Sequence, residues 1–103
     1  MQLGRVIGTV VATQRAATTE GWSLRVVEKL NVHNQLTGSY VVAVDAIGVG
    51  PDEVVMYTTG SAARQTDQTA SRPCDAIIMA VVDIWEVEGN VKYRKDHPLQ
   101  EPT

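Results

Sequence analysis

The chain has 103 residues, a length that fits one small domain and limits the free energy that a single core can supply. A formal net charge of −3 leaves no excess of cations to attract nucleic acid or anionic lipid, and 44% hydrophobic residues is too apolar a composition for a disordered chain. The sequence opens without a charged leader and contains no run near the ~20 apolar residues that span a bilayer, so we expect a cytosolic protein.

Short runs rich in Val, Ile and Thr alternate with Gly, Asn, Asp and Pro, which is typical of β-strands joined by turns. Gly4 and Gly8 fall inside the first run and indicate a bulge or sharp bend, which favours a barrel. Five closely spaced strands suit a small all-β barrel or sandwich. The predicted strands are residues 3–13, 22–31, 40–47, 53–59 and 76–87.

The last predicted strand, residues 76–87, is apolar for nearly its full length instead of alternating. One face of this strand can meet the core of the barrel. The other face then needs a second covering surface, which a chain this short can hardly supply by itself. We therefore expect another subunit to cover part of this strand.

A hairpin is predicted directly after this strand. We expect a three-residue loop, with Asn90 in the left-handed position that such a loop requires, because this register gives matched cross-strand pairs. It places Val87 opposite Val91, Trp85 opposite Tyr93 and Glu86 opposite Lys92.

Two segments contain few residues that could pack into a core. Residues 65–72 are polar, and residues 95–103 include two prolines and little to bury. Neither segment resembles a linker between domains, so residues 1–94 are predicted to form a single domain followed by a flexible tail.

No group of residues has the spacing of a catalytic or metal site. Several acids could supply a general acid or base, but nothing in the sequence pairs them. The histidines are too far apart to suggest a shared metal ion, and the lone cysteine is expected to be a buried thiol. We therefore predict no enzyme activity, no cofactor and no metal; the residues considered are Asp45, Glu53, Asp75, Asp83, His33, His97, Ser61 and Cys74.

The segment Gly48–Val49–Gly50–Pro51–Asp52–Glu53 has the glycines of a phosphate-binding loop. It lacks the Lys-Ser/Thr ending of a P-loop, and its two acids would repel phosphate. A tight turn explains the glycines more simply.

Asp45 stands within an apolar strand, where a carboxylate is costly to bury unless it is paired. Arg64 is a plausible partner. The four small residues before Arg64 would let another backbone approach closely, so this part of the chain is predicted to be an association surface. These residues are Gly60, Ser61, Ala62 and Ala63.

Four motifs in order along nearly the whole chain resemble the EutN/CcmL family, the pentameric vertex proteins of bacterial microcompartment shells. The motifs read MQLGRVIGTVVATQ, VDAIGVGPDEVV, GSAAR and RPCDAIIMAVVD in this sequence. The resemblance implies a five-stranded barrel similar to an OB-fold, with a short helical turn, assembled as a ring of five around an axial pore. It also implies hexameric shell proteins as neighbours, and no cofactor, nucleic acid or membrane.

The resemblance also suggests positions for individual residues. Gly48, Val49 and Gly50 would lie near the axial opening, and residues 61–64 would lie near a neighbouring subunit, together with Asp45 and Gly60. The main alternative is an OB-type module that binds single-stranded nucleic acid or oligosaccharide on exposed aromatic side chains. The negative charge and the absence of a Lys/Arg stripe argue against this alternative.

Overall fold

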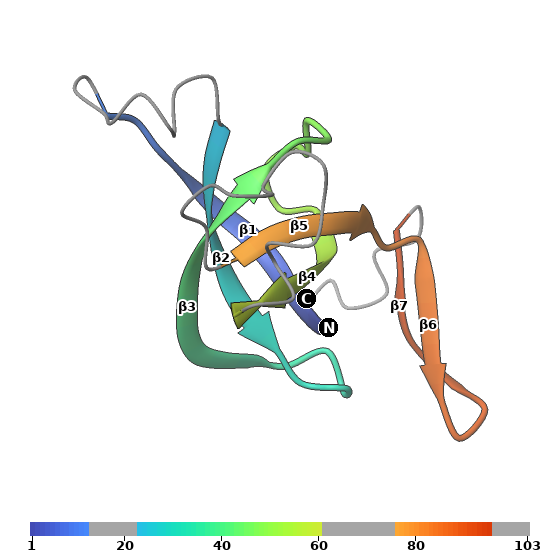
Figure 1. The fold of residues 1–103 in the computed structure, drawn as a ribbon. Helices are drawn as coiled ribbons and strands as arrows, with labels where there is room; N and C mark the ends of the chain where they lie inside the picture. The colour runs from blue at the N-terminus through green and yellow to red at the C-terminus, as the bar shows by residue number, and fades with distance from the viewer. Residues whose placement is uncertain (13–22, 61–75, 96–103) are drawn as a thin grey trace.

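A computed structural model describes residues 1–12, 23–60 and 76–95 of the chain. Every regular element within these residues is a β-strand (Figure 1). The strands are β1 (Gln2–Val10), β2 (Ser23–Leu30), β3 (Leu36–Asp45), β4 (Val54–Thr59), β5 (Ala76–Val81), β6 (Ile84–Val87) and β7 (Asn90–Arg94). Gly60, which follows β4, has 3-10 helical geometry, and beyond this residue the short helical turn expected from the family resemblance stays a prediction.

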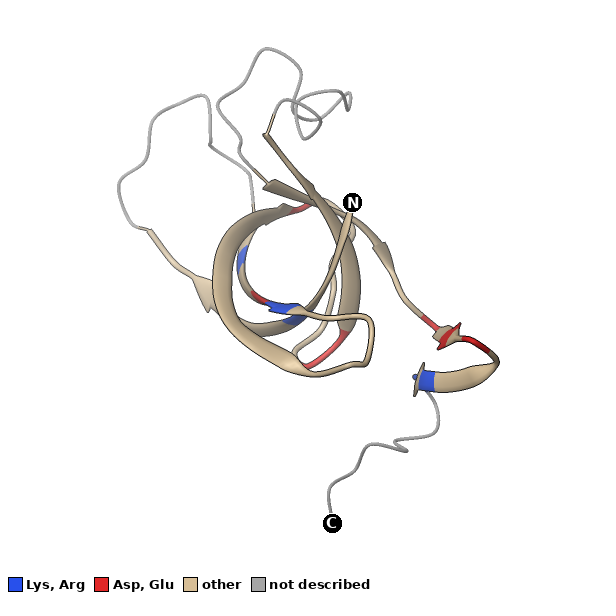
Figure 2. Cartoon of the chain, turned by 90° about the horizontal axis from the view of Figure 1, so that it is seen from below, with Lys and Arg blue, Asp and Glu red and all other residues tan. Residues whose placement is uncertain are grey.

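The first five strands close into a barrel in the order β1-β2-β3-β5-β4, with β1 paired to both β2 and β4. Neighbouring strands are antiparallel except β3 and β5, which run parallel and pair through Val44 and Ile77. Viewed from below, the strands of the barrel form a ring (Figure 2). The predicted five-stranded, OB-like barrel is confirmed.

The glycines of β1 permit both the bend and the close packing of this strand. The register of β1 against β2 shifts between Val6 and Gly8, which confirms the predicted bulge. A Cβ atom on Gly4 would lie 2.4 Å from Cγ1 of Val27 and 2.9 Å from Cε1 of Tyr57. Gly4 thus lets two core side chains approach the β1 backbone.

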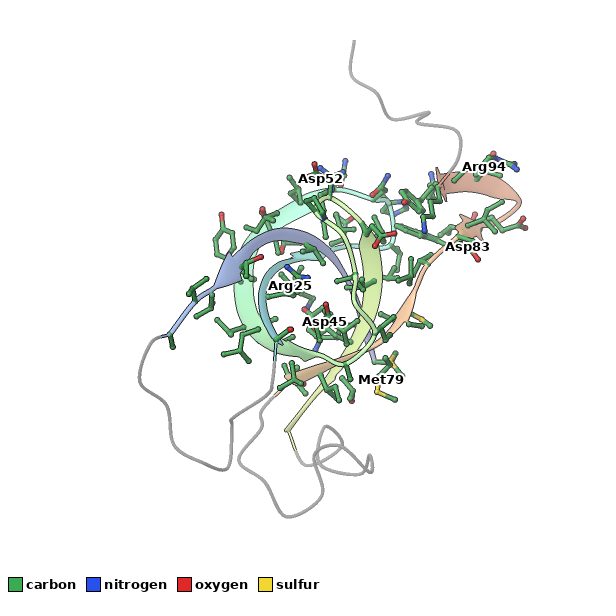
Figure 3. The ribbon with its side chains drawn as sticks, turned by 90° about the horizontal axis from the view of Figure 1, so that it is seen from above. Arg25, Asp45, Asp52, Met79, Asp83 and Arg94 are labelled. Carbon is green, nitrogen blue, oxygen red and sulfur yellow. The ribbon has the colours of Figure 1, made fainter. Side chains whose placement is uncertain are left out.

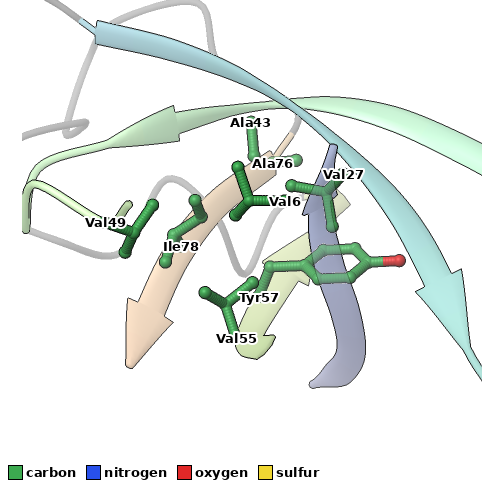
Figure 4. Packing of buried hydrophobic residues seen from close by; sticks show 8 residues of the cluster. All are labelled: Val6, Val27, Ala43, Val49, Val55, Tyr57, Ala76 and Ile78. Carbon is green, nitrogen blue, oxygen red and sulfur yellow. The ribbon is translucent and has the colours of Figure 1, made fainter. Parts of the chain in front are cut away.

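The core of the barrel consists mainly of aliphatic side chains, as the absence of Phe requires. Tyr57 is its one aromatic member, and its hydroxyl donates a hydrogen bond to Gln2 Oε1 at 3.1 Å. Burial raises the pKa of Tyr57. The cluster comprises Val6, Val27, Ala43, Val49, Val55, Tyr57, Ala76 and Ile78 (Figure 4).

The single strand predicted for residues 76–87 is wrong, because the chain leaves the barrel between β5 and β6. Val82 is a buried residue whose N–H donates to the Val54 carbonyl at 2.8 Å. After Asp83, β6 pairs only with β7 in a separate two-stranded sheet. A continuous apolar run could not reveal this bend, because the side chains on both sides of it are apolar.

The predicted register of the β6–β7 hairpin is only partly right. Trp85 does pair with Tyr93, and their rings stack with centroids 5.5 Å apart. The loop, however, has two residues, Glu88 and Gly89, with φ of 52° and 82°, so Asn90 is not the left-handed residue. As a result Val87 pairs with Asn90 and Glu86 with Val91, and a register shift next to Trp85 restores the aromatic pair.

Strand β3 begins at Leu36, earlier than the predicted residue 40. The turn before it is closed by Asn31, whose N–H donates to the Gln35 carbonyl at 3.0 Å. The Asn31 Oδ1 also accepts hydrogen bonds from the amides of His33 and Gln35. His33 belongs to this turn and is exposed.

We expect Gly4→Ala to lower the free energy of unfolding by about 1–3 kcal/mol, since the added methyl overlaps a packed core. Gly8→Ala is the matched control, because its Cβ would meet Val26 atoms no closer than 3.7 Å, an ordinary contact. Urea unfolding of both variants measures the difference. An equal cost at the two positions would contradict the close approach at Gly4.

Candidate functional site

The buried carboxylate of Asp45 holds the loop that follows β3. Its Oδ1 accepts hydrogen bonds from the N–H groups of Ile47 at 2.9 Å and Gly48 at 2.8 Å. Its Oδ2 accepts from the N–H of Val49 at 2.9 Å and from Arg25 Nε at 3.1 Å. The side chain of Asp45 has no exposed surface, so each of these bonds replaces a lost bond to water.

Arg25 is the partner of Asp45 that sequence reasoning missed. It lies on β2, opposite Ala43, and its Nη1 also donates to Thr9 Oγ1 at 2.7 Å. Figure 3 shows Arg25 and Asp45 together inside the ring of strands. Arg64, the partner expected from the sequence, lies outside the described residues. The alternation of side chains along β2 could have indicated Arg25, because it places Arg25 on the same side of the strand as the buried Val27.

The environment of Asp45 favours its ionised form. Burial by itself raises the pKa of this carboxyl group, but the hydrogen bonds from the Gly48 and Ile47 amides, Arg25 and the Val49 amide outweigh it. The pKa of Asp45 therefore lies below its usual value. Asp45 is a charged anchor at neutral pH and is poorly suited to give or take a proton there.

A second carboxylate holds the other half of the loop. Glu53 Oε1 accepts a hydrogen bond from the Gly50 N–H at 2.5 Å, and its Oε2 forms an ion pair with Lys95 Nζ at 2.8 Å. The bond from Lys95, together with the one from Gly50, lowers the pKa of Glu53, and the Lys95 pKa is raised by the same contact. Glu53 thus joins this loop to the chain that leaves β7.

The loop cannot act as a phosphate cradle in this conformation. Four consecutive N–H groups, those of residues 47–50, are directed at the carboxylates of Asp45 and Glu53. A phosphate group would need the same donors. This geometry supports the interpretation of the glycines as turn residues.

The predicted pore residues differ in exposure. Gly48 is exposed and Gly50 is half-buried, whereas Val49 is 2% exposed and packs in the barrel core. Val49 thus contributes only its main chain to any surface. Ile47, which sequence reasoning did not select, has a side chain that is 50% exposed on the same loop.

The predicted interface residues are only partly described. Gly60 follows β4, and no atom lies within 4 Å of the position that its Cβ would occupy. Asp45 already has a full set of partners within its own chain. Residues 61–64 lie outside the described residues, so their place in an interface stays a prediction.

The surplus of apolar surface expected for residues 76–87 is found at two positions. Ile77 and Ile78 are buried, but Met79 is 41% exposed and Ile84 is 46% exposed. Further large apolar side chains are exposed on other strands, among them Tyr40 at 63% and Val42 at 49%. Within the described ranges, no group of three His, Cys, Asp or Glu side chains could hold a metal ion, and no helix could cross a membrane.

The chain is thus a closed OB-like barrel with two carboxylates occupied by structural bonds and a partly apolar exterior. A family model described as "Ethanolamine utilisation protein EutN/carboxysome" matches residues 1–83. The chain belongs to this EutN/CcmL family.

Among its relatives is the carboxysome shell vertex protein CcmL of Gloeobacter violaceus, 37% identical over 95 residues that cover 92% of this chain and 95% of the relative. The bacterial microcompartment shell vertex protein EutN of Escherichia coli is 33% identical over 92% of this chain and 100% of its own.

Solved structures agree with this relationship. The structure of G. violaceus CcmL superposes with a TM-score of 0.90 at 36% identity, covering 94% of this chain and 100% of that one. The GrpN pentameric microcompartment shell protein of Rhodospirillum rubrum has a TM-score of 0.77 at 39% identity, with coverage of 84% and 99%. Both identities are high enough for the likeness to extend beyond the fold to the family.

We expect Asp45→Asn to lower the free energy of unfolding at neutral pH by about 1–3 kcal/mol, since it removes a charged acceptor from a buried site. The folded-state pKa of Asp45 is depressed, so its stabilising contribution is complete above about pH 4 and is lost as the pH falls through the lower folded value. The variant should therefore lose less stability than the parent between pH 7 and about pH 3.

Urea unfolding at fixed protein concentration measures both effects, because assembly makes stability concentration-dependent. Glu53→Gln is the matched control, since its partly exposed ion pair with Lys95 should contribute at most about 1 kcal/mol. Equal losses in the two variants, with unchanged pH dependence, would contradict the anchoring role of Asp45.

Proposed function

We propose that this chain is a structural subunit of a bacterial microcompartment shell, which assembles as a ring of five and closes the vertices of the shell. The observation that carries this proposal is the match over more than nine-tenths of the chain to proteins named shell vertex proteins. The likeness to a pentameric member of the family supports the number of subunits. The protein would thus work in the cytoplasm of a bacterium, within the shell.

The surface of the chain is compatible with this role. A ring of five is a heterologous assembly, in which one patch of each subunit meets a different patch of the next. Such a ring would cover part of the exposed apolar surface, which includes Tyr40, Val42, Met79 and Ile84. Flat layers of hexameric shell proteins leave fivefold gaps where they curve into a polyhedron, so we propose these hexamers as the outer neighbours.

We further propose that the loop after β3 surrounds the axial opening, through Gly48, Gly50 and the main chain of Val49. The hydrogen bonds to Asp45 and Glu53 support this assignment, because a defined opening requires a loop with a fixed main chain.

The proposed contact with a neighbouring subunit involves Gly60 and residues 61–64, while Asp45, whose side chain is fully buried, would contribute only by holding the loop after β3. The open space at Gly60 supports this assignment. A single domain over residues 1–94 with a tail from residue 95 also remains a proposal.

The structure offers little support for an OB-type nucleic-acid or oligosaccharide binder. Such proteins use the face of β2 and β3 with aromatic stacking platforms and a cationic groove. Tyr40 is the one aromatic side chain on these two strands, and the net charge of the chain is −3. A role without catalysis is likewise the simpler proposal, because Asp45 and Glu53 already serve structural bonds.

Native mass spectrometry at micromolar concentration should find five copies of the 11.2-kDa chain in one particle. Co-expression with hexameric shell proteins should then give closed particles by electron microscopy, and omission of this chain should give open or elongated ones. A purified protein that stays monomeric or dimeric, or shells that close equally well without it, would contradict the proposal.

Ala62→Trp should weaken the pentamer more than it weakens the subunit fold, because bulk is placed where close approach is proposed. Ala62 is preferred to Gly60 for this test, since Gly60 has φ of 67° and a tryptophan there would strain the backbone by itself. Native mass spectrometry and urea unfolding separate the two effects. Intact pentamers of unchanged stability would remove residues 60–64 from the interface.

A further inference from the structure

The loop after β3 has two halves that are held in different ways. Residues 47–49 donate their N–H groups to Asp45, whose side chain has no exposed surface. Gly50, the next residue, donates its N–H to Glu53 Oε1, and the side chain of Glu53 is 24% exposed. Water can therefore compete for the second attachment but not for the first.

The carboxylate of Glu53 joins two distant parts of the chain. Its Oε1 accepts the hydrogen bond from Gly50, and its Oε2 accepts one from Lys95 Nζ at 2.8 Å. Lys95 follows β7, so the carboxylate connects the loop with the end of the hairpin. The bond from Lys95 is the largest cause of the lowered pKa of Glu53, and the bond from Gly50 comes second. Both contacts thus stabilise the charged form of one side chain.

The main chain at Glu53 is fixed independently of these contacts. The Glu53 carbonyl accepts a hydrogen bond from the Val6 N–H at 2.9 Å, and the Asp52 N–H donates to the Val6 carbonyl at 2.8 Å. These two bonds attach the residues just before β4 to β1. When a contact of the carboxylate is lost, the main chain of Glu53 therefore stays in place and its side chain rotates.

The hairpin sets the position of Lys95. The Lys95 N–H donates to the Asp83 carbonyl at 2.8 Å, which extends the pairing of β6 and β7 by one bond. Asp83 and Arg94 lie outside the ring of strands, whereas Asp45 lies inside it (Figure 3). The ammonium group of Lys95 thus reaches Glu53 from a sheet that is separate from the barrel.

Other hydrogen bonds attach the hairpin to the opposite end of β3. Trp85 Nε1 donates to the Val32 carbonyl at 2.9 Å, and Asn34 Nδ2 donates to the Lys92 carbonyl at 3.0 Å. Both acceptors or donors on the barrel side belong to the turn before β3. The hairpin is therefore attached to the turn before β3 and, through the Lys95 side chain, to the loop after it.

We propose that Glu53 couples the hairpin to this loop, so that withdrawal of the Lys95 ammonium group releases Gly50 while residues 47–49 stay in place. The two oxygens of a carboxylate belong to one planar group, so a rotation that changes the position of Oε2 also turns Oε1 away from the Gly50 N–H. Without the cation, the charged side chain gains hydration by turning outward. Gly50 then loses its acceptor, and the Asp45 half of the loop is unaffected.

This coupling belongs to the single chain and goes beyond the proposed function. The side chain of Lys95 is 44% exposed, so an anion outside the subunit can compete with Glu53 for it. In the proposed ring Gly50 borders the axial opening, and its release would loosen one part of the lining. That last consequence alone rests on the proposed function.

Amide hydrogen exchange at single-residue resolution tests the coupling in the intact chain. We expect Lys95→Met to raise the exchange rate of the Gly50 N–H by about three- to fivefold, as the loss of a partly exposed ion pair predicts. The N–H groups of Gly48 and Val49 should exchange as in the parent protein, because their acceptor does not contact Lys95.

Two further variants serve as controls. Lys92→Met removes the same charge from β7, and Lys92 forms no ion pair with the described residues, so the exchange of Gly50 should not change. Lys95→Arg keeps the cation that Glu53 binds and should keep the exchange rate of Gly50 near that of the parent. A rise in Lys95→Arg as large as that in Lys95→Met would show that the charge is not what matters, and would overturn the coupling.

Two other outcomes would also overturn it. One is an unchanged exchange rate of Gly50 in Lys95→Met. The other is an equal rise at Gly48, Val49 and Gly50, because the loop would then loosen as a whole. The measurement applies equally to a monomer and to a pentamer, so a failure of the proposed function remains distinguishable from a failure of the coupling.

Glu53→Gln tests the same bridge from its other end. The contact with Glu53 raises the pKa of Lys95, so the amine is less often unprotonated and less reactive in the parent protein. We expect acetic anhydride to acetylate Lys95 about three- to fivefold faster in Glu53→Gln, with Lys92 as the internal reference. Equal rates for Lys95 in the two proteins, measured by peptide mass spectrometry, would contradict the bridge.

Discussion

The buried carboxylate of Asp45 sets the arrangement of one end of the barrel. A charge without access to water must be matched by donors, and three backbone N–H groups and Arg25 supply them. The loop after β3 is consequently tied to β2, although Asp45 and Arg25 are 20 residues apart in the sequence. Loss of any one of these partners would leave the charge short of a donor, so the loop and the strand keep one relative position.

The second constraint is the small size of the domain. A chain of 103 residues without Phe fills its barrel mainly with Val, Ile and Ala, whose burial yields less than that of aromatic side chains. Side chains as large as Tyr40 and Ile84 remain exposed because the single subunit has no further layer to cover them. Association therefore completes the burial that the chain begins.

The barrel could be predicted from the sequence because its strands have strong local signals. Runs of β-branched residues marked the strands, and Gly8 marked the bulge that helps the sheet to close. The partner of Asp45 was missed because Arg25 comes next to this carboxylate only after β2 and β3 pair. The bend after Val82 was missed because two different apolar environments, the barrel and the hairpin core, look alike in a sequence.

The register of the β6–β7 hairpin could also be predicted only in part. The stacked pair Trp85–Tyr93 was foreseen, but a two-residue turn with a left-handed Glu88 was not, since few side chains favour that conformation. The segment of residues 48–53 was predicted as a tight turn, but the hydrogen bonds that hold it were not predicted. The direction of a backbone N–H depends on tertiary contacts that no local pattern encodes.

The surface of the loop after β3 can change while its main chain keeps the same shape. Ile47 has its N–H fixed by Asp45, while its side chain is half exposed. Charge or bulk could therefore be exchanged at this position while the main-chain scaffold around it stays in place. The protein thus separates the part that gives the loop its shape from the part that gives it its chemical character, and the second is free to vary.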